Sequence, residues 1–142
     1  MNKITIILAL AASVSLISCL KQNVDDSPAL SGGGADGSYN WSTIADTAEL
    51  ALDYFWSPSG KYYLSSNTSS DWAQYWPQAH ALDVLTDAYL RNPSTTIKAK
   101  MNDLLTGVRA KKGGSWINYY YDDMEWMALA CLRAYTATND SR

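Results

Sequence analysis

Residues 119–126 read Tyr-Tyr-Tyr-Asp-Asp-Met-Glu-Trp and lead into an apolar run that extends to residue 135. The run is rich in good helix formers and contains no Gly or Pro, so we predict a helix. Apolar residues occur nearly all round it, which is typical of a helix buried on several sides. We expect the polar start of this helix, with Asp122 and Asp123, to lie where the buried layer meets a cleft or solvent.

Asp122 and Asp123 form a pair of adjacent carboxylates. Neighbouring residues on a helix point about 100° apart, so the two carboxyl groups can lie roughly 5 to 6 Å from each other. Retaining glycosidases separate nucleophile and acid by about 5 to 5.5 Å, whereas inverting enzymes leave about 6.5 to 9.5 Å for a water. At this distance two carboxylates repel by about 3 kcal/mol, so one can hold a proton while the other stays charged. The pattern favours a retaining sugar hydrolase.

A structural role for the same pair fits the sequence as well. Asp122 followed three residues later by Glu125 has the form of a capping box, and acidic residues are common in a first helical turn. Neighbouring tyrosines and tryptophans favour the catalytic interpretation, because flat aromatic faces pack against sugars. The chain holds 16 Trp and Tyr residues in total. For any single one of them, however, a place in the helical core is an equally ordinary role.

Two stretches of the chain resemble glycoside hydrolase family 76, the endo-acting α-1,6-mannanases. Residues 116–135 read Trp-Ile-Asn-Tyr-Tyr-Tyr-Asp-Asp-Met-Glu-Trp-Met-Ala-Leu-Ala-Cys-Leu-Arg-Ala-Tyr, and residues 75–85 read Tyr-Trp-Pro-Gln-Ala-His-Ala-Leu-Asp-Val-Leu. A consecutive Asp-Asp pair carries catalysis in that family. The resemblance therefore implies that Asp122 is the nucleophile and that Asp123 is the general acid/base, with no cofactor.

Aromatic residues near the paired aspartates are the candidates for contact with the substrate. Tyr121, Trp76 and Trp126 are the expected neighbours of the sugar-binding subsite. His80 is the only histidine of the chain, and it either lines the sugar cleft or has a structural role. The expected ligand is an α-mannan polysaccharide or oligosaccharide.

The fold implied by the resemblance is all-α. Family members resemble an (α/α)6 toroid, in which outer and inner helices alternate. We expect four helices, at about residues 41–56, 77–91, 94–112 and from 122 onward, the third in the outer ring and the fourth in the inner ring. Residues 41–142 would then be the N-terminal portion of such a domain, and we expect the catalytic domain to be incomplete.

Local signals set the expected ends of these helices. Ser42 is a candidate N-cap of the first helix, and Pro77 occupies a favoured first helical position in the second. Residues 61–75 are expected to form an irregular polar loop. The Gly113-Gly114 pair is expected to end the third helix.

The first 40 residues carry export signals. Residues 1–19 read as a signal peptide, and its closing Leu-Ile-Ser-Cys resembles a bacterial lipobox that would leave Cys19 lipidated. An ordinary secretory signal with a chance cysteine is the alternative. Residues 20–40 form a Gly- and Ser-rich tether, and their Asp25-Asp26 pair resembles export signals of Bacteroidetes lipoproteins. We expect a membrane-anchored lipoprotein of the outer membrane or cell surface, with periplasmic display as the other choice.

Composition excludes several other classes of function. Lys and Arg number 11 against 14 Asp and Glu, for a net charge of −3, and no basic patch occurs, so we expect no nucleic-acid partner. The sequence shows no cluster of metal ligands, and we expect no metal. With Cys19 lipidated, only Cys131 remains, so no internal disulfide forms and Cys131 is expected to be a small core residue.

Two further classes remain open at this point. A helical glycan-binding lipoprotein without hydrolytic activity would explain the anchor, the tether and the aromatic residues, but not the paired aspartates. A degenerate product would leave apolar helix faces unpaired and would aggregate or stay molten.

Overall fold

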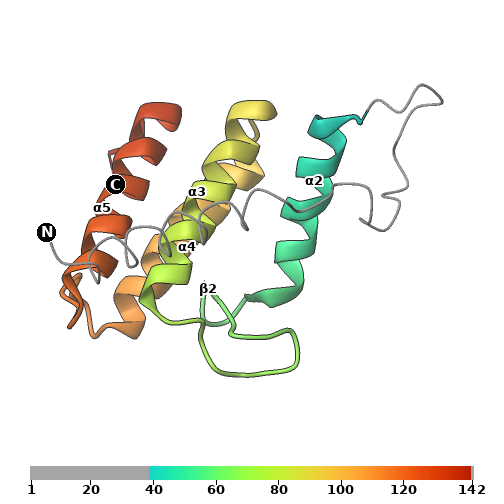
Figure 1. Cartoon of the computed structure of the whole chain (residues 1–142). Coiled ribbons are helices and arrows are strands. Elements are labelled where there is room, and N and C mark those ends of the chain that lie inside the picture. The colour runs from blue at the N-terminus through green and yellow to red at the C-terminus, as the bar shows by residue number, and fades with distance from the viewer. Residues whose placement is uncertain (1–38, 142) are drawn as a thin grey trace, which may run out of the picture. The chain divides into compact units, whose positions relative to one another are not determined.

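Four α-helices make up most of the part of the chain that the computed structural model describes, residues 39–141 (Figure 1). They are α2 (Trp41–Leu52), α3 (Tyr75–Arg91), α4 (Thr95–Lys111) and α5 (Tyr121–Thr138). The predicted signal peptide, Cys19 and most of the predicted tether lie outside the described residues. Within residues 39–141, no helix is long and apolar enough to cross a bilayer.

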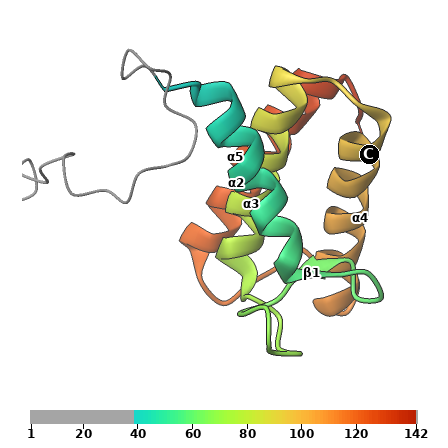
Figure 2. The ribbon, with the colours of Figure 1, turned by 90° about the vertical axis from the view of Figure 1, so that its right-hand side faces the viewer.

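The helices alternate in direction in the manner of an α/α layer. α3 and α5 start at the same end and run side by side, while α2 and α4 run the opposite way (Figures 1 and 2). α5 packs mainly against α3, and α3 also packs against α4 and α2. The assignment of α4 to the outer ring and of α5 to the inner ring stays a prediction.

The core lies between α3, α4 and α5. The buried apolar residues include Leu82 and Leu85 on α3 and Leu104 and Val108 on α4. α5 contributes Met127, Ala130 and Ala134. By contrast, α2 has no fully buried residue, which marks it as peripheral.

Some predicted helix ends were wrong by a few residues. The N-cap of α2 is Asn40, whose side chain accepts a hydrogen bond from the Thr43 N–H at 3.1 Å, so Ser42 lies inside the helix. α2 stops at Leu52, and a short 3-10 turn, η2 (Asp53–Phe55), follows it. α3 begins two residues before Pro77. Ser94, given as the start of the third helix, is the N-cap of α4, and its side chain accepts a hydrogen bond from the Ile97 N–H at 3.1 Å.

The segment expected to be an irregular loop contains a small hairpin. β1 (Trp56–Ser57) pairs antiparallel with β2 (Tyr62–Tyr63), and an isolated bridge joins Leu64 to Trp72. The buried side chain of Gln78 on α3 bonds to both backbone groups of Tyr63, so the hairpin is fixed to the first turns of α3.

The prediction that α5 is buried on several sides was also wrong. Its buried residues fall on one stripe, because α3 is the only described helix with extensive contacts to it. The rest of its apolar surface is exposed and includes Trp126, Leu129, Leu132 and Tyr135. Unpaired apolar surface of this kind was expected only under the degenerate-product alternative.

Candidate active site

The starts of α3 and α5 lie together at the end of the helical layer that carries the β-hairpin (Figure 1). The first two turns of α3 hold Trp76 and His80, and those of α5 hold Asp122, Asp123 and Trp126. The ring centroids of His80 and Trp126 are 5.1 Å apart. Two stretches that lie far apart in the sequence thus meet at one place.

Trp76, His80 and Trp126 form an aromatic cluster beside the aspartates. The ring centroid of His80 lies 5.5 Å from that of Trp76, and the imidazole also contacts the ring of Trp126. Both indoles remain half exposed, at 51% for Trp76 and 47% for Trp126. Exposed aromatic faces offer an apolar surface to the C–H face of a sugar ring.

Asp122 and Asp123 lie inside the first turn of α5. The helix starts at Tyr121, and its N-cap Tyr120 makes no side-chain cap bond, so the alternative capping box of Asp122 with Glu125 is not formed. The backbone N–H groups of a first turn have no intrahelical partner and favour negative charge. The two carboxylates differ in environment, since Asp122 is exposed and Asp123 is only 8% exposed.

The loop before α5 supplies a polar contact to Asp123. Asn118 Nδ2 donates to Asp123 Oδ2 at 2.5 Å, and Lys112 Nζ donates to Asn118 Oδ1 at 2.9 Å. The sequence placed Asn118 in the family-like motif without a role and placed Lys112 at the expected end of the third helix. No periodic pattern reveals this contact, because it depends on how residues 112–120 fold back over the start of α5.

Tyr75 is a second residue that builds the site and that the sequence did not reveal. It is 3% exposed, and its hydroxyl donates to the backbone carbonyl of Trp116 at 3.0 Å. Burial raises the pKa of Tyr75, and the nearby Cys131 and Asp123 raise it further. The phenol therefore stays neutral and acts as a donor that ties the loop to α3.

Tyr121 does not join the aromatic cluster. Its side chain is 80% exposed, and within residues 39–141 no ring contact includes it. It stands at the start of α5 next to Asp122, on the solvent side. In the same part of the chain, no three His, Cys, Asp or Glu side chains are grouped to hold a metal ion.

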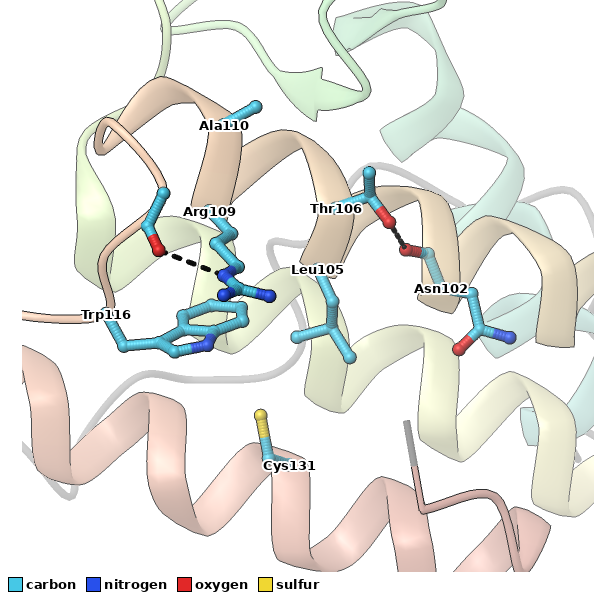
Figure 3. A pocket seen from close by; sticks show the side chains of 8 residues that line it. Asn102, Leu105, Thr106, Arg109, Ala110, Trp116 and Cys131 are labelled. Atoms are coloured by element: carbon cyan, nitrogen blue, oxygen red, sulfur yellow. Dashed lines mark hydrogen bonds between the residues drawn. The ribbon is translucent and has the colours of Figure 1, made fainter.

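Two of the hollows in the described chain lie near the starts of α3 and α5 or between α4 and α5. One, of about 600 Å³, lies between α4 and α5 and is mostly apolar; its lining includes Leu105, Trp116 and Cys131 (Figure 3). Neither aspartate lines it, and burial raises the pKa of the Cys131 thiol, so it lacks a reactive group. The other, of about 650 Å³, is lined by Trp72 and Trp76 and adjoins the aromatic cluster through Trp76.

The described fold is similar to solved structures of sugar hydrolases. The GH76A α-1,6-mannanase from Salegentibacter sp. HEL1_6 matches 71% of this chain with 35% sequence identity and a TM-score of 0.66. The match covers 30% of that chain. This is part of the fold of the glycoside hydrolase family 76 mannanases. The family-76 resemblance found in the two sequence stretches is thereby confirmed, as is the all-α fold class.

Further solved structures are similar to this chain, again over part of their length. An inactive variant of the same mannanase, with two consecutive aspartates changed to alanine, was solved in complex with α-1,6-mannotetrose and matches at 33% identity and a TM-score of 0.66. The Lin0763 protein from Listeria innocua matches at 29% identity and a TM-score of 0.58. The chain spans about 30% of the length of these structures. A scan of protein-family models and a search of curated proteins found no match.

Proposed function

We propose that this chain acts in the retaining endo-hydrolysis of α-1,6-mannosidic bonds in mannan. One observation carries the proposal: Asp122 and Asp123 stand at the start of α5 beside exposed indoles, in a fold shared with α-1,6-mannanases. The inactive variants of the Salegentibacter enzyme carry changes at two consecutive aspartates. Within residues 39–141, Asp122 and Asp123 are the only two aspartates that are adjacent in sequence.

In the proposed reaction the two carboxyl groups act in turn. The carboxylate of Asp122 attacks the anomeric carbon, while Asp123 gives its proton to the glycosidic oxygen as the C–O bond breaks. Asp123, now a carboxylate, then takes a proton from water. The water oxygen attacks the anomeric carbon and releases Asp122, which restores both groups to their starting states.

The different surroundings of the two aspartates support this division of roles. Asp122 is exposed at the first turn of α5, where a substrate can reach it. Asp123 is buried except for 8% of its surface and accepts a hydrogen bond from Asn118. A nucleophile needs charge and access, whereas an acid needs a fixed position next to the leaving oxygen.

The aromatic surfaces suggest where the polysaccharide lies. Trp76 belongs both to the aromatic cluster and to the hollow of about 650 Å³, so it links the surface near the aspartates to a concave region. That volume falls within the range of about 300 to 1,000 Å³ typical of ligand sites. We propose that mannose units on one side of the scissile bond follow this surface.

We also propose that the domain is tethered to a membrane by lipidated Cys19. The support is the sequence of residues 1–19 and the Gly- and Ser-rich stretch after it. Expression of the full chain in a bacterium fed a labelled fatty acid tests this. Label should appear in the wild-type chain and be absent from Cys19→Ala; label in neither chain would refute the anchor.

Hydrolysis itself is tested by incubating the purified full chain with unbranched α-1,6-mannan and measuring new reducing ends. Release is expected from wild type and from Asp46→Asn, a matched change at an exposed aspartate of α2 paired with Arg91. Asp122→Asn should abolish release but keep mannan binding. Binding without release by the wild-type chain would instead support the glycan-binding alternative.

A further inference from the structure

Three side chains from different parts of the fold form a chain of hydrogen bonds, called here the relay, that ends on Asp123. Lys112 lies at the end of α4, Asn118 lies in the following loop, and Asp123 lies on α5. Lys112 Nζ donates to Asn118 Oδ1 at 2.9 Å, and Asn118 Nδ2 donates to Asp123 Oδ2 at 2.5 Å. All three contacting groups are at least partly shielded from solvent, so the bonds are not exchanged freely with water.

The chemistry of the two end groups fixes the orientation of the amide between them. An ammonium group only donates hydrogen bonds, and a carboxyl oxygen that carries no proton, such as Oδ2 when the acid proton of Asp123 is on Oδ1, only accepts them. Asn118 must therefore turn its oxygen toward Lys112 and its NH2 group toward Asp123. An aspartate or an aliphatic residue at position 118 could not make both contacts.

Lys112 and the loop are themselves held in place by α3 and α4. The ammonium group of Lys112 lies 5.8 Å from the ring centroid of Tyr75, whose hydroxyl bonds to the Trp116 carbonyl. Arg109 on α4 donates to the Gly114 carbonyl at 3.0 Å. The loop that carries Asn118 is thus fixed at several points before it reaches α5.

We propose that Asn118 is the positioning residue of Asp123 and that Lys112 sets the orientation of its amide. This inference rests on the function proposed above for Asp123. Asn118 donates a hydrogen bond to Oδ2 of Asp123, and within residues 39–141 no other side chain donates to this carboxyl group. Oδ1 is then the oxygen presented to the glycosidic bond, and the amide keeps the carboxyl from rotating.

A first test needs no enzymatic activity. The side-chain NH2 resonances of Asn118 are assigned by NMR in the full chain, with Lys112→Met, Asp123→Ala and the control Lys111→Met. Lys111 faces the Tyr62 ring and does not touch Asn118. The amide proton bonded to Asp123 should resonate downfield of its NH2 partner and exchange slowly in wild type and Lys111→Met. In Asp123→Ala this proton should lose both its downfield shift and its slow exchange, and in Lys112→Met both effects should be smaller. Unchanged resonances in Asp123→Ala would overturn the proposal.

A second test measures steady-state kinetics on α-1,6-mannan. Asn118→Ala should lower kcat by about 10- to 100-fold with KM within about twofold, because a displaced catalytic group slows chemistry more than binding. Ser115→Ala, a loop variant whose hydroxyl accepts only from the Ile117 N–H, should keep its kcat. Far-UV spectra confirm that each variant is folded.

The two tests separate the possible failures. If wild type hydrolyses mannan and Asn118→Ala keeps its kcat, the positioning role is refuted and the proposed function stands. If wild type releases no sugar, the proposed function fails for this chain. The NMR comparison then still decides whether Asn118 holds the Asp123 carboxyl.

Discussion

Gln78 provides a quantitative test of how the site is built. It is fully buried on α3, where its Oε1 accepts from the Tyr63 N–H at 2.9 Å and its Nε2 donates to the carbonyls of Tyr63 and Ala73 at 2.8 and 3.1 Å. These bonds hold the β-hairpin and the following loop against the first turns of α3. Gln78→Leu keeps most of the volume and removes all three bonds.

The expected loss follows from the groups that are left without partners. The Tyr63 N–H is buried and has no alternative acceptor in the described chain, whereas the Tyr63 carbonyl still accepts from the Ala73 N–H at 2.8 Å. One orphaned buried donor and the lost bonds should cost about 2 to 4 kcal/mol. For a domain near 100 residues, at about 4 °C per kcal/mol, the melting temperature should fall by about 8 to 16 °C.

Urea unfolding followed by far-UV circular dichroism measures this loss, provided that the wild-type chain unfolds in one transition. Thr86→Val is the matched control. Thr86 is also fully buried on α3, but its hydroxyl donates only to the Leu82 carbonyl one turn earlier, at 2.8 Å. Its loss should be under about 1 kcal/mol. Equal losses for the two variants would refute the role assigned to Gln78.

Three other perturbations test neighbouring parts of the structure. In Gly107→Ala the new Cβ would lie 2.0 Å from the backbone oxygen of Lys61, so we expect a loss of about 1 to 3 kcal/mol in urea unfolding, and an unchanged midpoint would contradict this packing. Tyr63→Phe removes a buried hydroxyl that has no partner in the described chain, so it should be neutral or stabilise by up to about 1 kcal/mol; a clear loss would reveal a missed partner. Burial, and then the charge of Asp53, raises the pKa of Glu49 above 4.5 in the folded state. Charged Glu49 therefore destabilises the folded chain at pH 7, and this effect disappears as pH falls below 4.5. Glu49→Gln should raise the urea midpoint of unfolding at pH 7 only. An equal rise in acid would contradict the raised pKa.

The sequence was sufficient for the approximate positions of the four described helices. Periodic apolar residues such as Leu82, Leu85, Leu104 and Val108 marked the buried faces of α3 and α4, because a helix in contact with a core repeats its pattern every turn.

Features that depend on tertiary contacts were not predictable in this way. The hairpin at β1 and β2 needs the buried amide of Gln78, and nothing in residues 56–63 alone signals that partner. The relay through Asn118 needs the loop to fold back onto α5. The apolar composition of α5 suggested burial on several sides, but composition cannot show which faces neighbouring elements cover.

The exposed face of α5 also bears on how the domain behaves in solution. Leu129 and Leu132 are 60% and 62% exposed, and both lie on the helix that carries the aspartates. Large apolar side chains at such exposure favour association or docking of further structure. Activity should therefore be measured together with the mass of the species in solution.

The most direct test of the account follows the reaction of the full chain with an unbranched α-1,6-linked mannooligosaccharide by proton NMR, beside Asp122→Asn. The account predicts that the wild-type chain cleaves the sugar and that the first product carries the α anomer, before mutarotation, while Asp122→Asn produces nothing. A first product with the β anomer would contradict the retaining pair. Equal cleavage by both chains would remove Asp122 from the reaction, and no cleavage by either would contradict the proposed hydrolysis.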